Sequence, residues 1–287
     1  MEHHDLIQER ASLAFNVTKD DVIVKHRLMG GMSHLTYHIE IGGQDYTYRV
    51  IGKDGNLFVD RHIEKANLEI IRPLHLNNET VYFDVETGEK AAKYVAGTVL
   101  TQLDYQAYLD DVATALKKLH HSTLAPAADY GLIERLNRYE TFTEIRSAMY
   151  LDLKNKWLDM YQKERKDQPK VFCHGDAQRS NIVIGERLYL LDWEYAGWNE
   201  FYYDIASFGN IDFEDALRLL DHYLGRKATQ EEANLVRFYR MYQALQWHQV
   251  ATRKDMIGLS EVLHFDFKML AEKYLNLALR LYTEIKG

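Results

Sequence analysis

The stretch that decides the fold is Phe172–Asp192, FCHGDAQRSNIVIGERLYLLD. It holds two short apolar runs, 182–184 and 188–191, with G-E-R between them, and this pattern predicts a hairpin of two strands. Because a tight hairpin folds its ends together, we expect Asn181 and Asp192 side by side at its mouth. Amide and carboxylate oxygens that converge there suit a hard cation such as Mg²⁺.

A second acid, Asp176, lies in a predicted loop a few residues before the hairpin. One acid that positions a nucleophile, with others that hold metal-bound phosphates, is the layout of a phosphoryl-transfer site. Two other interpretations were weighed: a turn or helix cap at Asp176, and a metal-dependent hydrolase that uses His174 with Asp176. H-G-D-x-x-x-x-N followed by an apolar hairpin and L-L-D-W-E favours the catalytic interpretation.

These residues resemble the catalytic and metal-binding core of the aminoglycoside-phosphotransferase and choline-kinase group, small-molecule kinases with a protein-kinase-like fold. The D-W-E-Y run at 192–195, followed by Y-D-I-A at 203–206, is most similar to bacterial choline/ethanolamine kinases. The resemblance covers nearly the whole chain and implies that ATP and Mg²⁺ are used. Asp176, Asn181 and Asp192 would then be catalytic, with Asn181, Asp192 and Glu194 as the metal residues.

The resemblance also implies an α+β fold of two lobes, with a small antiparallel sheet in the first and mainly helices in the second. The sequence agrees, because strand signals dominate residues 21–51 and helical periodicity takes over after Thr101. We therefore predict a nucleotide-binding lobe at 1–92, a catalytic and substrate-binding lobe at 93–287, and a hinge at about 91–97.

In the first lobe, strand patterns predict a meander whose first turn is rich in glycine. Glycines let backbone N–H groups approach phosphate oxygens, so Gly30, Gly31 and Ser33 are candidate nucleotide-binding residues. A pair of glycines between strands is also what a plain hairpin turn requires.

Arg49 is a cation inside an otherwise apolar and aromatic strand, and a predicted helix at about 61–75 carries Glu64 near its start. In the kinase arrangement a strand cation, held by a helix carboxylate, contacts the nucleotide phosphates. Arginine can grip both groups in a bidentate way, although a surface cross-strand charge is the alternative. The resemblance further places Lys93 and Val95 in the hinge, where backbone groups would bind the adenine edge.

In the second lobe, a helix stripe from Tyr105 to Leu119 ends at His120-His121, which we interpret as a helix end and not as metal ligands. Another long helix is predicted near 137–163. A capping box at Thr229 opens a further helix, and an amphipathic helix closes the chain.

Aromatic side chains of this lobe are the candidates for acceptor binding, because aromatic faces attract quaternary ammonium groups. With Glu194 as a counter-charge, the candidates are Tyr195, Trp198 and Trp247, although such aromatics also fill cores. Similar choline kinases often carry two tryptophans three residues apart on this helix. Here Trp247 matches the first tryptophan, but Val250 occupies the position of the second. Ethanolamine or another amino alcohol therefore stays an alternative to choline.

Composition bounds the remaining possibilities. The chain has 287 residues, 46% of them hydrophobic, and a formal charge of −8, which argues against nucleic acid as the main partner. Its single cysteine, Cys173, excludes an intramolecular disulfide framework and is interpreted as a packed residue. No signal pattern or membrane-spanning run is seen, so a cytoplasmic protein with a small-molecule alcohol substrate is expected. Kinases of aminoglycosides or thiamine, a nucleotide-binding pseudokinase and a hydrolase remain alternatives, and the sequence predicts no oligomeric state.

Overall fold

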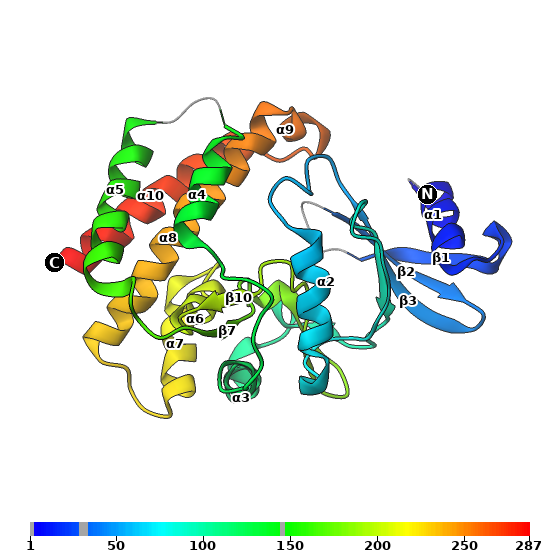
Figure 1. Cartoon of the computed structure of the whole chain (residues 1–287), viewed down its shortest axis with the longest axis horizontal. Helices are drawn as coiled ribbons and strands as arrows, with labels where there is room; N and C mark the ends of the chain where they lie inside the picture. Colours follow the sequence, from blue (N-terminus) through cyan, green and yellow to red (C-terminus); the bar gives the residue numbers. More distant parts are fainter. Residues whose placement is uncertain (1–2, 29–33, 144–146) are drawn as a thin grey trace. The chain divides into compact units, whose positions relative to one another are not determined.

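The computed structural model describes residues 3–28, 34–143 and 147–287, and these form two compact units (Figure 1). The first unit runs to Tyr105 and also includes residues 124–127 and 179–195, whereas the second holds the remainder. The division differs from the predicted boundary at residue 92, because the hairpin of the signature stretch pairs with a strand that follows the first sheet. The α+β class is confirmed.

The first unit is built on a five-stranded antiparallel sheet with the strand order β1-β2-β3-β5-β4. Its elements are α1 (His4–Phe15), β1 (Val22–Leu28), β2 (His34–Ile41), β3 (Gln44–Ile51), α2 (Arg61–Ile70), β4 (Thr80–Phe83), β5 (Lys90–Lys93), β6 (Thr98–Val99), β8 (Ile182–Ile184) and β9 (Leu188–Leu190). The meander is therefore confirmed, and its β2–β3 turn uses Gly42 and Gly43, both with positive φ.

The two faces of this sheet differ, because one carries apolar core residues and the other carries charged residues. Tyr48 of β3 lies opposite Ala91 of β5, and both belong to the buried core that packs against Ile7 of α1. The next pair along the strands, Arg49 and Lys90, must point to the opposite face because successive side chains alternate. That face is covered by α2, so α1 and α2 lie on opposite sides of the sheet (Figure 1).

The signature hairpin, β8 and β9, joins β6 in a separate three-stranded sheet. The chain crosses itself closely here, at Gly97 and Gly185. A Cβ atom on Gly97 would lie 2.5 Å from the carbonyl oxygen of Ile184, and one on Gly185 would lie 2.6 Å from that of Ala96. Only glycine fits at these two points, and the crossing fixes where the hairpin begins and ends.

The second unit is mainly helical, with one short two-stranded sheet formed by β7 and β10. Its elements are α3 (Leu109–His120), α4 (Leu132–Glu140), α5 (Ala148–Met160), β7 (Val171–Cys173), β10 (Gly197–Asn199), α6 (Tyr202–Phe208), α7 (Phe213–Leu224), α8 (Gln230–Met256), α9 (Leu259–Val262) and α10 (Phe267–Lys286). The long helix α8 packs along α10 (Figure 1).

The capping box predicted at Thr229 is confirmed at the start of α8. The Glu232 N–H donates to the Thr229 hydroxyl, and the Thr229 N–H donates to the Glu232 carboxylate. Further along, α8 passes through the core of the second unit, where the fully buried Trp157 of α5 donates its indole N–H to the Phe238 carbonyl. The buried centre of α8 therefore anchors the helices around it.

Two predicted helix boundaries were wrong. The helix predicted at 61–75 ends at Ile70, and a short 3₁₀ turn that contains Pro73 follows, because proline cannot continue an α-helix. The single helix predicted near 137–163 is two helices, α4 and α5, and Ser147 caps the second through the Tyr150 N–H. No helix within the described part of the chain has both the length and the apolarity to cross a membrane.

Candidate active site

The H-G-D loop of the second unit follows directly from strand β7. Gly175 has a φ of +80°, a backbone conformation that glycine adopts without steric cost. The Asp176 N–H donates to Nδ1 of His174 across 3.2 Å, so the loop is closed by its own histidine. His174 is fully buried. The buried ring therefore supports the loop, and the backbone position of Asp176 is fixed.

Asp204 of α6 holds the same loop from the other side. One of its carboxylate oxygens accepts the His174 N–H at 2.7 Å, and the other accepts the Gly175 N–H at 2.8 Å. Asp204 is fully buried. A buried carboxylate that accepts two backbone N–H groups makes strong charge-assisted hydrogen bonds. The backbone immediately before Asp176 is therefore fixed by a residue about thirty positions later in the chain.

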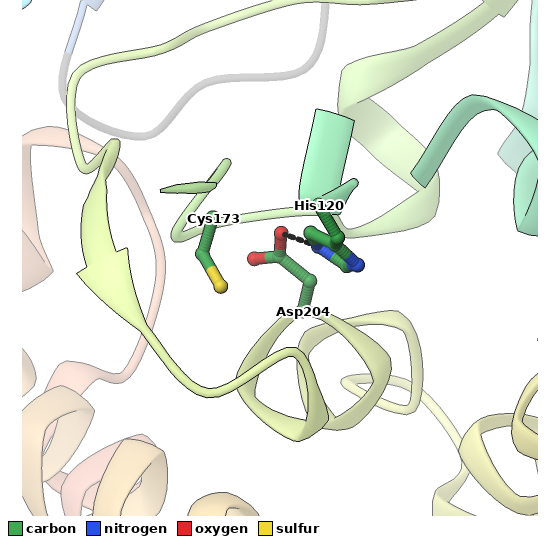
Figure 2. Close-up of side chains that lie close together, drawn as sticks. All are labelled: His120, Cys173 and Asp204. Atoms are coloured by element: carbon green, nitrogen blue, oxygen red, sulfur yellow. Dashed lines mark hydrogen bonds and ion pairs between the residues drawn. The ribbon is translucent and has the colours of Figure 1, made fainter. Parts of the chain in front are cut away.

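Asp204 also meets His120, the last residue of α3, and Cys173 lies beside them (Figure 2). These three side chains are close enough to suggest a metal site. However, both ring nitrogens of His120 already have partners. Nε2 donates to Asp204 at 3.0 Å, so Nδ1 accepts the hydroxyl proton of Tyr223, whose oxygen lies 2.9 Å away. Burial raises the pKa of the Cys173 thiol well above its usual range, which opposes the thiolate that a metal needs. The cluster is better explained as a brace for the loop.

Sequence reasoning missed the brace. His120 was interpreted only as a helix end, which is correct for its place in α3 but says nothing of its partner. The available signal was the Y-D-I-A run, because an aspartate that begins a wholly buried helix requires a polar partner. Cys173 is buried as predicted.

The hairpin mouth lies in the first unit, and a backbone hydrogen bond joins its two ends. The Leu191 N–H donates to the Asn181 carbonyl across 2.7 Å, which brings the backbone of Asn181 beside the residue that precedes Asp192. Asp192 has a φ of +65°, and aspartate is one of the few non-glycine residues that tolerate this conformation. Its side chain is about one third exposed.

Glu64 of α2 is the centre of an ion-pair cluster in the same unit. The predicted pairing with Arg49 is present, at 2.9 Å. Arg61, one helical turn earlier, lies 2.6 Å from Glu64, and Lys90 of the neighbouring strand lies 2.8 Å away. The Asp60 side chain caps α2 and so fixes where the helix presents Arg61 and Glu64. Sequence reasoning missed Arg61 and Lys90, although Arg61 stands three residues before Glu64.

The cluster continues to the acids after the hairpin. Arg49 lies 3.4 Å from Asp192 and 3.9 Å from Glu194. Glu194 also pairs with Arg61 at 2.8 Å and with His34 at 3.2 Å. Glu194 is therefore held by Arg61 and His34, whereas Asp192 keeps partial exposure beside Arg49.

The pKa values follow from this arrangement. Burial acts to raise the pKa of the Glu64 carboxyl, but the positive charges around it, that of Arg49 first, hold the pKa well below its usual range. Burial likewise opposes ionisation of Glu194, yet His34 and then Arg61 lower the pKa of Glu194 to about 2. Both carboxylates are therefore ionised at neutral pH and anchor the cations.

Asp192 behaves differently. Loss of hydration raises its pKa, the negative charge of Glu194 raises the pKa further, and Arg49 opposes both effects without cancelling them. A divalent cation would relieve this repulsion, because it favours the ionised form of a carboxylate. The hard oxygen donors of Asn181 and Asp192 fit Mg²⁺. Glu194, already held by Arg61 and His34, suits a supporting role beside that pair.

Glu64→Gln is expected to lower the free energy of unfolding by about 2–3 kcal/mol, because three buried cations lose their common counter-charge. The Michaelis constant for ATP should also rise, since Arg49 would no longer be held. Chemical denaturation and steady-state kinetics measure the two effects. Glu69→Gln, an exposed position on the same helix, is the matched control, and equal behaviour of the two variants would contradict this role of Glu64.

The remaining predicted site residues that the structure describes are not part of the ion-pair cluster around Glu64 or of the H-G-D loop. Gly30, Gly31 and Ser33 lie outside the described residues. The Lys93 N–H donates to the Glu79 carbonyl, and the Lys93 carbonyl accepts from the Asn78 amide, so its backbone already has partners. Val95 follows in the connection to β6. Of the aromatic candidates, Tyr195 is buried in the first unit, whereas Trp198 of β10 and Trp247 of α8 are half-buried in the second.

The chain matches a protein family and is similar to several known proteins. The profile of the phosphotransferase enzyme family matches residues 26–240. Protein LicA of Haemophilus influenzae is 26% identical over 207 residues, which cover 68% of this chain and 61% of that protein. Ethanolamine kinase 2 of Mus musculus is 27% identical over 179 residues, which cover 56% of this chain and 46% of that protein. The chain thus spans less than two thirds of the length of these relatives.

Among solved structures, choline kinase LicA from Streptococcus pneumoniae has a TM-score of 0.80 with this chain and is 22% identical, with 99% of each chain covered. At this identity the likeness shows a shared fold, and the fold implied by the sequence resemblance is confirmed.

Proposed function

This chain belongs to the phosphotransferase enzyme family, and we propose that it transfers the γ-phosphate of ATP to the hydroxyl of a small amino alcohol, choline or ethanolamine. One observation carries the proposal most directly. Asp192, the predicted metal residue, lies 3.4 Å from Arg49, the predicted phosphate-binding cation, and Glu64 holds that cation. A metal carboxylate beside a clamped arginine is what the phosphates of a nucleotide require.

Each residue of the site has a role in this reaction. Asp176 orients the acceptor hydroxyl and takes its proton as the new P–O bond forms and the bond from the γ-phosphorus to the bridging oxygen of the departing ADP breaks. Arg49 binds phosphate oxygens, and Glu64 keeps its guanidinium in place. Asn181 and Asp192 would hold Mg²⁺, which would neutralise phosphate charge. Catalysis is then mostly positioning and charge stabilisation, because a loose transition state asks for little covalent help.

The choice of acceptor is supported by two lines. Two of the similar proteins are named choline kinase and ethanolamine kinase. Trp247 offers a half-buried aromatic face on α8, whereas Val250, one turn later, is buried and aliphatic. A quaternary ammonium group benefits most from several aromatic walls. We therefore propose an amino alcohol as the acceptor class, with choline and ethanolamine as the two candidates.

A single assay tests the function. Turnover of Mg-ATP is measured with choline, ethanolamine, thiamine, an aminoglycoside and no acceptor. We expect ADP formation that depends on choline or ethanolamine and disappears when Mg²⁺ is chelated. Nucleotide binding without turnover on any alcohol would identify a pseudokinase, and ester hydrolysis without nucleotide would identify a hydrolase; either result would end the proposal.

A further inference from the structure

Arg240 of α8 is a buried cation that lacks an acidic partner. Arg240 is only 2% exposed. Its two terminal nitrogens donate to neutral oxygens, Oε1 of Gln243 and the main-chain carbonyl of Asn210, both at 3.2 Å. Its Nε has no hydrogen-bond partner, and within residues 3–28, 34–143 and 147–287 no carboxylate lies within 4.0 Å of the guanidinium.

Such a group is costly to keep in a core. A charge taken out of water without a close counter-charge destabilises the fold by several kcal/mol as an order of magnitude. Burial accordingly lowers the pKa of the Arg240 guanidinium, and the groups that oppose this shift are Tyr274 of α10, Tyr203 of α6 and Asp176 of the H-G-D loop. Asp176 is the one acid among them. The negative charge of the predicted catalytic carboxylate therefore acts on the Arg240 guanidinium without a direct contact between the two.

Hydrogen bonds also join the two residues. Arg240 donates to the carbonyl of Asn210, which lies between α6 and α7. The Asn210 side-chain amide donates to Oε1 of Gln178, and Nε2 of Gln178 donates to Oδ2 of Asp176 at 2.8 Å. The other terminal nitrogen of Arg240 donates to Oε1 of Gln243. The Gln243 amide in turn donates to the Tyr203 carbonyl at 2.9 Å, which holds Gln243 in place.

We propose that Arg240 is a positioning residue for Asp176, acting through Asn210 and Gln178 and through its buried positive charge. Gln178 orients the carboxylate by binding one of its oxygens. Arg240 fixes the main chain of Asn210, whose side-chain amide holds Gln178, and its positive charge stabilises the ionised carboxylate that must take the hydroxyl proton. The inference rests on the proposed function, because Asp176 needs such support only if it acts on an acceptor.

The structure distinguishes this role from that of the cations in the first unit. Arg49 and Arg61 each contact a carboxylate within 2.9 Å, so their charges are already balanced. Arg240 has only neutral direct partners, and its charge therefore acts beyond its own contacts. The alternative use of this charge is to bind an anionic group on the acceptor, and the experiment separates the two uses.

The experiment compares Arg240→Met with Arg237→Met. Arg237 lies one turn earlier on the same helix but has its own acidic partner, Glu284, at 3.0 Å. With Mg-ATP and the best acceptor of the panel, we expect Arg240→Met to lower kcat by about 10- to 100-fold, because a small misplacement of a reacting group has effects of this size. The KM for the acceptor should change by less than about threefold. Arg237→Met should keep the wild-type kcat.

Three further variants guard against a folding artefact. Arg240→Ala should regain part of its kcat when guanidinium ions are added at concentrations that leave wild-type enzyme folded. Gln178→Leu should also lower kcat, and the double variant Gln178→Leu/Arg240→Met should lose much less than the product of the two single effects, because both act on Asp176. A purely structural arginine predicts neither rescue nor coupling.

Three outcomes would overturn the inference. An Arg240→Met enzyme with wild-type kcat removes the role, and a raised KM for the acceptor at unchanged kcat assigns Arg240 to substrate binding. Fully multiplicative effects of Gln178→Leu and Arg240→Met contradict the relay. Failure of the proposed function is recognised separately, since wild-type enzyme would then show no acceptor-dependent turnover at all.

Discussion

Asp176→Ala is expected to lower kcat by about 10²- to 10⁴-fold, the contribution typical of a positioned general base. Asp176 follows a loop that is fixed by Asp204 and His174, so the substitution removes the carboxylate without removing the support of the backbone. The Michaelis constant for ATP should stay close to that of the wild type, because the cluster around Arg49 that we propose to bind the phosphates belongs to the first unit.

Steady-state kinetics with Mg-ATP and the preferred acceptor measure this effect, and nucleotide binding is followed separately by calorimetry. Asp167→Ala serves as the control, because Asp167 is an exposed acid of the same unit. Near-normal turnover by Asp176→Ala, under conditions where the control is also active, would refute the catalytic assignment.

Asp204→Ala is expected to have the largest effect on stability, a loss of about 3–5 kcal/mol in the free energy of unfolding. The substitution leaves the N–H groups of His174 and Gly175 buried without their acceptor, and it removes the partner of His120 Nε2. Each unsatisfied buried donor costs about 1–3 kcal/mol. Since whole domains are stable by only about 5–15 kcal/mol, the variant should be close to unfolding.

Denaturant titration followed by circular dichroism measures this loss. Asp204→Asn should fall between wild type and Asp204→Ala, because an amide oxygen can accept one of the two N–H groups while its NH₂ opposes the other. Asp159→Ala is the control, since its exposed pair with Lys163 contributes little. A loss for Asp204→Ala no larger than that of Asp159→Ala would mean that the loop does not depend on this carboxylate.

The elements that sequence predicts well are those specified by neighbours in the chain. The hairpin of β8 and β9 follows from two apolar runs and a short turn, and the capping box at Thr229 follows from residues three positions apart. The ion pair of Arg49 and Glu64 could also be predicted, because a charged residue within a half-buried strand requires a partner on the helix that covers it.

Apart from the local pair of Arg61 with Glu64, the contacts that sequence reasoning missed join distant parts of the chain. Asp204 meets His174 thirty residues away, Arg61 meets Glu194 across 133 residues, and Asn210 meets Gln178 across 32. No local spacing carries such information. The division of the chain into units likewise depends on distant contacts, because the signature hairpin joins a strand near residue 98 that lies far earlier in the sequence.

The tight crossing at Gly97 and Gly185 has a consequence for how this protein tolerates change. Because carbonyl oxygens leave no space for a side chain there, a methyl group on either residue must push the hairpin away from β6. Asn181 and Asp192 stand at the base of that hairpin, so alanine at Gly97 would shift two proposed cation ligands that it never touches. Mutational scans should therefore find these two glycines nearly as intolerant of substitution as the acids themselves.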